Sequence, residues 1–573
     1  MVTITAVMSN RSRQTMLKAQ RYAGVLLRGM FLFSFMATGS AVAQDVGTTE
    51  IFRDALRDRV GLPLNQDTLI VDNRPLQSHE DVTRLYLLRS FLPAWIDGNG
   101  KLGSAASALV ERIRAVTEDG LDPSRYRTDE IDARLTRLAE GDAATLDELI
   151  DLELLLSDAW LTLADHLLRG RVDPEHLYGQ WLASPQERDL VALLETALSG
   201  GEPGAALDEL TPAYTTYGRL RAALAQLRAI DPASEPPRVA SGTALRLGEE
   251  DERVPVLRKR LRFLGDLPES ANLDDTRFDG QVDAALLSFQ ARHGLEADGI
   301  FGRGTRAAVN TSMAERAAQV EANMERFRWL PQAVESRHLR VNIADFRLEL
   351  VEDDVPVMTM DVIVGKPYRQ TPVFSGSMSY LVFSPAWHLP PTISRKDILP
   401  RLKRDPQSLA EDGIRVLSGW GEDEREVDPA SVDWKKISAR NLPYHFRQDP
   451  GPQNALGRVK FMFPNRFSVY LHDTPQRELF DRAQRDFSSG CIRVERPQDL
   501  AIHLLLEDPA WTPEAVAVAM NSGTEQTVSL PRPLPVHIYY LTAWVDDEGG
   551  LQFREDLYGR DAGLLEALRK AGF

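Results

Sequence analysis

The sequence predicts a multidomain α+β protein in which a helical region and a small helical module precede a β-rich domain. Its 573 residues are enough for about three or four domains. Apolar residues recur at helical spacing up to about residue 236, and from about residue 337 they alternate with polar residues as in strands. Hydrophobic residues make up 43% and charged residues 26%, which is typical of a chain with packed cores.

The first 43 residues differ in composition from the rest. They carry five Lys or Arg and no acidic residue, and an apolar run, "GMFLFSFMATGSAVAQ", contains the small-x-small sequence Ala41-Val42-Ala43. This pattern predicts a secretory signal peptide over residues 1–43. The run is shorter than the ~20 residues needed to span a bilayer. We therefore expect export with cleavage of the signal, the alternative being retention as an inner-membrane anchor.

Residues 44–236 are predicted to form a helical scaffold domain. The stretch "DELIDLELLLSDAWLTLADHLLRG" has apolar residues on one helical face and ends at Gly170, a natural helix stop. A linker, "DPASEPPRVASG", leads to a compact segment over residues 245–313. Two amphipathic patterns and the glycine turn Asp298-Gly299-Ile300-Phe301-Gly302 predict a three-helix module there.

Residues 337–525 are predicted to form the β-rich domain. "HLRVNIADFRLELVEDDVPVMTMDVIVG" alternates apolar and polar residues between charged turns, as successive strands do. This alternation of apolar and polar residues is absent between about residues 392 and 453, where the chain is charged, irregular and interrupted by Pro. A compact sheet has no need of so long a connection, so we expect an inserted subdomain or lid. Residues 526–573 are expected to complete the region with strands and a helix.

Charge and cysteine content exclude several classes of function. The net charge of -17 and the lack of a Lys/Arg cluster argue against a nucleic-acid partner. A single cysteine excludes thiolate-rich zinc sites, and His472-Asp473 has no partners at ligand spacing. We therefore expect neither a metal nor a cofactor.

The single cysteine, Cys491, follows Ser488-Ser489-Gly490, and His472 ends the apolar stretch "RFSVYLHD" upstream of it. An unpaired thiol in an exported protein risks unwanted disulfides, so its presence suggests a reactive role. The alternative is a small buried hydrophobe. A cysteine nucleophile needs a nearby base, usually histidine, although separation in sequence does not prove contact.

These residues resemble the signature of the L,D-transpeptidase (YkuD-like) family, a histidine, a spacer and Ser/Thr-His-Gly-Cys. Here His472 is followed by fifteen residues and then by "SSGCIRV". The chain departs from the signature at Ser489, where a second histidine is common, and at Val494. This form resembles the large, lid-containing Gram-negative members (YcbB-like), and "VGKPYRQTPVF" and "NALGRVKFMFPN" also fit the family. "FQARHGLEADGIFGRGTRAAV" resembles a peptidoglycan-binding module, the alternative being an insert that binds nothing.

The resemblance implies roles for individual residues. Cys491 is expected to be the nucleophile and His472 the proton acceptor and donor, oriented by a backbone carbonyl near Asp473 or, alternatively, by the Asp473 carboxylate. Backbone N–H groups of Gly490 and Cys491 are expected to form the oxyanion hole. Arg493 is expected to bind substrate carboxylates or to brace the Cys491 loop, with a structural ion pair as the alternative. Further substrate-binding candidates are Ser488, Ser489, Tyr470 and Trp387.

The implied reaction joins peptidoglycan stem peptides in the periplasm. A tetrapeptide donor is expected to form a thioester on Cys491, and the diaminopimelate amine of an acceptor stem is expected to resolve it as a 3→3 cross-link. Two alternatives stay open: an L,D-carboxypeptidase or cross-link hydrolase using the same site, and a wall-binding protein without activity. A carbapenem is expected to acylate Cys491, and other wall-synthesis enzymes are candidate partners.

Overall fold

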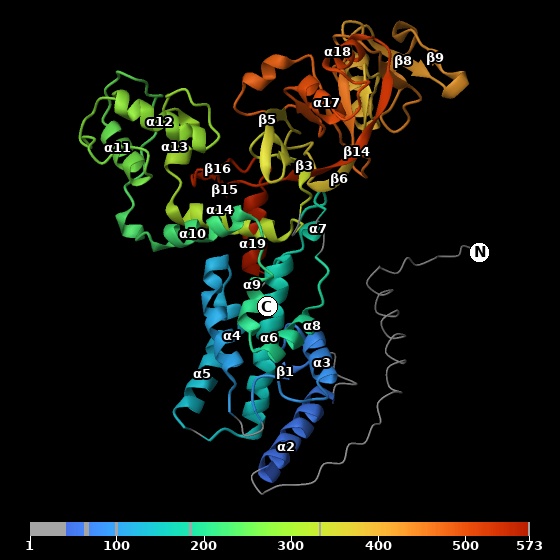
Figure 1. Ribbon diagram of the computed structural model, residues 1–573. Helices are drawn as coiled ribbons and strands as arrows, with labels where there is room; N and C mark the ends of the chain where they lie inside the picture. The colour runs from blue at the N-terminus through green and yellow to red at the C-terminus, as the bar shows by residue number, and fades with distance from the viewer. Residues whose placement is uncertain are drawn as a thin grey trace.

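The computed structural model describes residues 42–61, 68–97, 101–141, 143–182, 186–331 and 334–570. The predicted signal segment, residues 1–43, lies almost wholly outside this part of the chain. Figure 1 shows three bodies: a helical scaffold, the small module at one side of it, and a barrel at the other side. No helix among the described residues is long and apolar enough to cross a membrane.

The scaffold is built around α6 (Leu146–Arg169), whose side chains are mostly buried. Thr145 and Glu148 form a reciprocal capping box at its start, and Gly170 ends it. The other scaffold helices are α2 (Val42–Gly61), α3 (His79–Leu88), α4 (Ser104–Arg114), α5 (Thr128–Ala139), α7 (Pro174–Leu177), α8 (Leu190–Gly200), α9 (Pro203–Asp208), α10 (Thr215–Ala229) and α14 (Met313–Arg328), with the short hairpin β1 (Ile70–Val71) and β2 (Arg74–Pro75).

The module consists of α11 (Val254–Phe263), α12 (Gly280–Arg292) and α13 (Arg303–Val309). Its core is its own: Leu257, Leu261, Leu286 and Phe289 are fully buried among each other. The module lies between α10 and α14 in the chain, and these two helices share a core elsewhere. It is therefore an insertion in the helical part of the protein, and it contacts the C-terminal strands, where His293 stacks on Phe553 (Figure 1).

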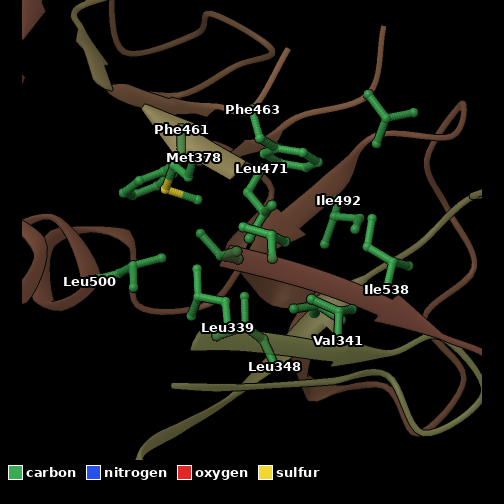
Figure 2. Close-up of a cluster of buried hydrophobic side chains, with 14 of the residues drawn as sticks. Leu339, Val341, Leu348, Met378, Phe461, Phe463, Leu471, Ile492, Leu500 and Ile538 are labelled. Atoms are coloured by element: carbon green, nitrogen blue, oxygen red, sulfur yellow. The ribbon is translucent and has the colours of Figure 1, made fainter. Parts of the chain in front are cut away.

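Eight strands close into a barrel in the order β11-β12-β13-β5-β4-β3-β14-β6. Figure 2 shows its filled interior, where inward side chains such as Leu339 and Val341 alternate with outward ones. The helices α17 (Pro497–Leu505) and α18 (Pro513–Asn521) follow β13, and α17 contributes Leu500 to the same core. The strands are β3 (Arg337–Asn342), β4 (Arg347–Glu352), β5 (Val355–Ile363), β6 (Phe374–Phe383), β11 (Val459–Met462), β12 (Leu471–His472), β13 (Ile492–Val494) and β14 (Gln526–Tyr539).

Between β6 and β11 the chain leaves the barrel and forms an inserted subdomain with its own core around Leu402 and Phe446. The sheet of this subdomain already begins at β7, ahead of the predicted start near residue 392, because β7 pairs with β10. The buried Asn454 amide joins both ends of the insertion by donating to the carbonyls of Pro385, Gln448 and Asp449. Its elements are β7 (Trp387–His388), α15 (Pro391–Ile393), a π-turn (Ser394–Ile398), α16 (Leu399–Arg404), β8 (Ile414–Ser418), β9 (Arg425–Glu426) and β10 (His445–Gln448).

The C-terminal segment ties the scaffold to the barrel. After β14 it forms β15 (Ala543–Val545), β16 (Leu551–Phe553) and α19 (Arg560–Lys570). Arg326 of α14 donates to Asp561 at 2.6 Å, and both side chains are largely buried. Tyr558 reaches the barrel, where its hydroxyl donates to Gly365 O at 2.7 Å. The protein is thus a multidomain α+β protein, as its sequence predicts.

Candidate active site

The pairing of two short strands places Cys491 and His472 on one face of the barrel wall. β12 and β13 are parallel, with Leu471 opposite Ile492, and Ile492 N donates to Tyr470 O at 3.1 Å. Leu471 and Ile492 are fully buried and point into the barrel core (Figure 2). Because successive side chains in a strand point to opposite faces, their neighbours point outward.

This alternation brings four sequence-predicted residues together. Tyr470, His472, Cys491 and Arg493 share the outer face of β12 and β13, with His472 directly opposite Arg493. The edge of the Tyr470 ring faces the His472 imidazole at a centroid distance of 5.7 Å. Cys491, 19 positions after His472, thus lies on the same face of the barrel wall.

His472 is held as a neutral base. Its Nδ1 lies 2.6 Å from the backbone oxygen of Asp473. A carbonyl only accepts, so Nδ1 carries the hydrogen and Nε2 presents a lone pair. Burial, followed by the positive charge of Arg493, lowers the pKa of His472 to about 3. At neutral pH the imidazole is therefore uncharged and able to accept a proton.

The Asp473 carboxylate does not orient the imidazole. Its oxygens accept from the backbone N–H groups of Arg458 at 2.8 Å and Thr474 at 2.7 Å. Of the two orienting groups considered from the sequence, the backbone carbonyl is the one in contact with His472. The carboxylate instead holds the residue before β11 and the segment after β12 together.

Cys491 is partly exposed, and burial raises the pKa of its thiol. The Tyr470 backbone and phenol, and more weakly Arg493, act in the opposite direction. The resting site therefore has a neutral thiol and, on the same face of the barrel wall, a neutral imidazole, rather than a preformed thiolate–imidazolium pair. Such a thiol needs a base at the moment of attack, which is the role that Nε2 is free to take.

The turn before Cys491 is fixed by its own hydrogen bonds. Ser488 Oγ donates to Cys491 O at 2.5 Å and accepts from Gly490 N at 3.0 Å. Ser488 is buried, so the structure places it within the loop and not toward a substrate. Gly490 has φ of +117°, which favours glycine. Its N–H is already bound to Ser488 and is not free as the predicted oxyanion donor, which leaves the Cys491 N–H as the candidate.

A second loop, residues 364–371, holds this turn in place by hydrogen bonds and is called the support loop. Thr371 is fully buried; its Oγ1 accepts from Gly365 N at 2.9 Å and donates to Gly490 O at 3.0 Å. A Cβ at Gly365 would collide with the backbone of Arg369 and Thr371. The Tyr558 hydroxyl accepts from Thr371 N at 3.1 Å. Sequence reasoning missed Thr371 and Tyr558, although Thr371 lies within the motif "VGKPYRQTPVF".

The remaining predicted residues occupy different places. Arg493 Nη1 donates to the Gln476 side chain at 2.7 Å, and burial lowers the pKa of Arg493. Ser489 accepts from Arg369 at 2.9 Å at the edge of the site. Trp387 lies in β7 and packs against the core of the insertion rather than against Cys491. Within the described residues, no group of three or more His, Cys, Asp or Glu is placed to hold a metal ion.

A thiol and a neutral imidazole on one barrel wall, with a braced turn before the thiol, are typical of enzymes that use a cysteine nucleophile. The comparisons with known proteins name the family. Residues 336–516 match the model of the L,D-transpeptidase catalytic domain (YkuD), residues 250–309 that of a putative peptidoglycan binding domain, and residues 80–224 that of a scaffold domain. Residues 336–516 are therefore similar to the YkuD-family L,D-transpeptidase catalytic domain, in agreement with the resemblance of the motifs.

A relative and two solved structures are similar to this chain. A putative L,D-transpeptidase of Haemophilus influenzae is 36% identical over 239 residues, which cover 42% of this chain and 47% of the relative. The match thus spans about half the length of that protein. L,D-transpeptidase crystal structures from Stackebrandtia nassauensis and Xylanimonas cellulosilytica cover 53% of this chain and 96% and 100% of theirs, at 13% and 15% identity. Their TM-scores of 0.21 and 0.16 are too low to support a conclusion about this chain.

Proposed function

We propose that the protein is an exported L,D-transpeptidase that joins two peptidoglycan stem peptides through a thioester on Cys491. The observation that carries the proposal is the outer face of β12 and β13, which carries both Cys491 and a neutral His472 within a domain that matches the L,D-transpeptidase model. The buried Asp473 carbonyl contact fixes the one tautomer that leaves Nε2 free.

In the first half-reaction the Cys491 sulfur attacks the carbonyl carbon of the third residue of a donor tetrapeptide. His472 Nε2 takes the thiol proton, so that the sulfur attacks as a thiolate. The Cys491 N–H stabilises the oxyanion. As the bond to the terminal D-alanine breaks, His472 returns the proton to its leaving amine, and a thioester remains.

In the second half-reaction the side-chain amine of diaminopimelate on another stem attacks the thioester. His472 Nε2 takes a proton from that amine and passes it to the departing Cys491 sulfur, which restores the thiol. One difficult amide exchange is thereby divided into two steps with a covalent intermediate. The same intermediate would be hydrolysed if water reached it first, so exclusion of water decides the product.

The other domains fit the same proposal. The module over residues 250–309 matches a peptidoglycan binding domain and stands apart from the barrel, where it can hold the polymer. The basic, apolar N-terminal segment fits export to the periplasm. The inserted subdomain borders the Cys491 loop through Arg369, a position suited to a lid over the site.

The test is to incubate the purified chain with a disaccharide-tetrapeptide and to identify the products by mass spectrometry. The proposal predicts cross-linked dimer and free D-alanine, both absent with Cys491→Ala. Tripeptide without dimer would indicate a carboxypeptidase instead. Dimer formation by the Cys491→Ala chain would contradict the role of Cys491.

A further inference from the structure

Arg369 joins three parts of the protein at the rim of the site. Its guanidinium makes a two-pronged contact with Asp397, with Nη1 to Oδ2 at 2.6 Å and Nη2 to Oδ1 at 2.8 Å. Nη1 also donates to Ser489 Oγ at 2.9 Å, two residues before Cys491. Asp397 lies in the π-turn of the inserted subdomain. The Arg369 side chain therefore links three parts of the protein: the support loop (residues 364–371), the turn before Cys491 and the inserted subdomain.

The Asp397 contact has the geometry with which arginine binds a free carboxylate ligand. A guanidinium presents two parallel N–H groups to two carboxylate oxygens, and a peptide carboxylate offers the same pair of acceptors. The Asp397 side chain is 43% exposed. The Arg369 side chain is only 15% exposed, so its guanidinium needs a partner. A ligand carboxylate in place of Asp397 gives it the same two-pronged contact and releases Asp397 to water, so the exchange of one carboxylate for the other has a small net cost.

The insertion does not depend on this contact for its attachment. Asn454 joins its two ends to each other, and Ala386 N donates to Glu525 of the barrel side at 2.7 Å. Its core around Leu402 is separate from the barrel core. Asp397 can therefore leave Arg369 while the insertion stays folded and attached.

The surroundings of the nucleophile favour an anionic ligand although the whole chain is acidic, with a net charge of -17. Arg493 lies on the face of Cys491, and in the described part of the chain its buried Nε has no hydrogen-bond partner. Lys366 lies 6.0 Å from the Tyr368 ring in the same loop as Arg369. Stem peptides carry several carboxylates, which this local positive charge would attract.

We propose that Arg369 binds a carboxylate of the donor stem and that Asp397 occupies this position in the free protein. The inference rests on the proposed function for the identity of the ligand. Donor binding then exchanges one carboxylate for another on Arg369 and separates the insertion from the Cys491 loop. Arg369 acts here in binding, and Asp397 acts as an internal competitor.

The test measures binding of a stem tetrapeptide to the Cys491→Ala chain by isothermal titration calorimetry, with second substitutions added. Arg369→Met is expected to weaken binding about 10-fold, and Arg369→Lys, which keeps the charge but loses the fork, about 3-fold. Asp397→Asn is expected to tighten binding about 3-fold. The matched control is Asp412→Asn, which breaks the 2.6 Å pair with Arg401 inside the insertion and is expected to leave binding unchanged.

Two amidated peptides identify the carboxylate. One carries an amide at the terminal D-alanine and the other an amide on diaminopimelate. The peptide that lacks the recognised carboxylate should bind the Cys491→Ala chain more weakly than the tetrapeptide does. Adding Arg369→Met should not weaken the binding of that peptide any further. Thermal unfolding of each variant verifies that the fold is retained.

The proposal is overturned if Arg369→Met and Arg369→Lys bind within 2-fold of the parent, or if no tetrapeptide binds. It is also overturned if Asp397→Asn weakens binding as much as Arg369→Met, because the pair would then be structural. A chain that binds as predicted but makes no Cys491-dependent product refutes the proposed reaction and leaves the carboxylate site standing.

Discussion

Replacing Thr371 by Val tests whether the support loop positions the nucleophile turn. The side chains have nearly the same shape, so no cavity forms, but the hydroxyl is lost. Gly365 N–H and Gly490 C=O then lose a partner at a fully buried position. An unsatisfied buried group costs about 1–3 kcal/mol, so the loss of a partner by two groups should lower the free energy of unfolding by roughly 2–6 kcal/mol. Thr371→Ser keeps the hydroxyl and is the matched control.

Two assays measure the effect. Urea unfolding followed by circular dichroism gives the stability, and intact-mass spectrometry gives the rate at which a carbapenem acylates Cys491. Thr371→Val should lower both, with the acylation rate reduced about 10-fold because the turn at Gly490 loses an anchor. Thr371→Ser should stay close to the parent in both. A valine variant within about 0.5 kcal/mol of the parent and equally reactive would refute the reasoning.

Three further predictions concern His472, Gly490 and Asn454. Because burial lowers the pKa of His472 to about 3, the rate of Cys491 acylation should be retained as pH falls through 6 and lost only near pH 3, and stopped-flow rates with a midpoint near 6.5 would contradict this. Gly490→Ala should lower the free energy of unfolding by about 1–3 kcal/mol and remove most of the acylation rate, because the φ of Gly490 is +117°. Gly451→Ala, with open space around the new methyl group, is the control and should behave as the parent in the same assays. Asn454→Ala removes the donor to three carbonyls, so deuterium exchange should rise across residues 386–453 and not in the barrel strands. Equal exchange in this variant and in an Asn441→Ala control would show that Asn454 does not hold the two ends of the insertion together.

The pH dependence of stability has a definite sign. The pKa of His472 in the folded protein lies below its ordinary value, so between these values the unfolded chain binds the extra proton. Burial of His472 therefore costs stability progressively as pH falls from about 6.5 toward 3, and the cost is absent above that range. Comparison of His472→Gln with the parent by thermal unfolding at pH 7 and pH 5 isolates this contribution.

The sequence predicts the parts of the site that depend on local pattern. Alternation along "RFSVYLHD" places Leu471 inward and His472 outward, and the motif around Cys491 predicts that this residue is the nucleophile. The boundaries of the helical and β-rich parts follow from the change of period from helix to strand. The separate core of the small module follows from its amphipathic helices and glycine turn.

Other parts depend on contacts that no local pattern contains. Tyr558 meets Thr371 across 187 positions, and this contact exists only because β14 closes the barrel and returns the chain to the support loop. The N–H of Gly490 was expected to serve the oxyanion, but a serine two residues earlier accepts its hydrogen bond. Trp387 was placed in the cleft from its position in sequence, whereas pairing of β7 with β10 carries it into the insertion.

The thioester on Cys491 is the centre of the account, and intact-mass spectrometry of the chain with donor tetrapeptide alone tests it most directly. We expect an adduct equal in mass to the donor without its D-alanine, located by digestion to the peptide that contains Cys491. The adduct should disappear when an acceptor stem is added and should not form in the Cys491→Ala chain. Cross-linked product without any adduct on Cys491, or an adduct at another residue, would contradict the account.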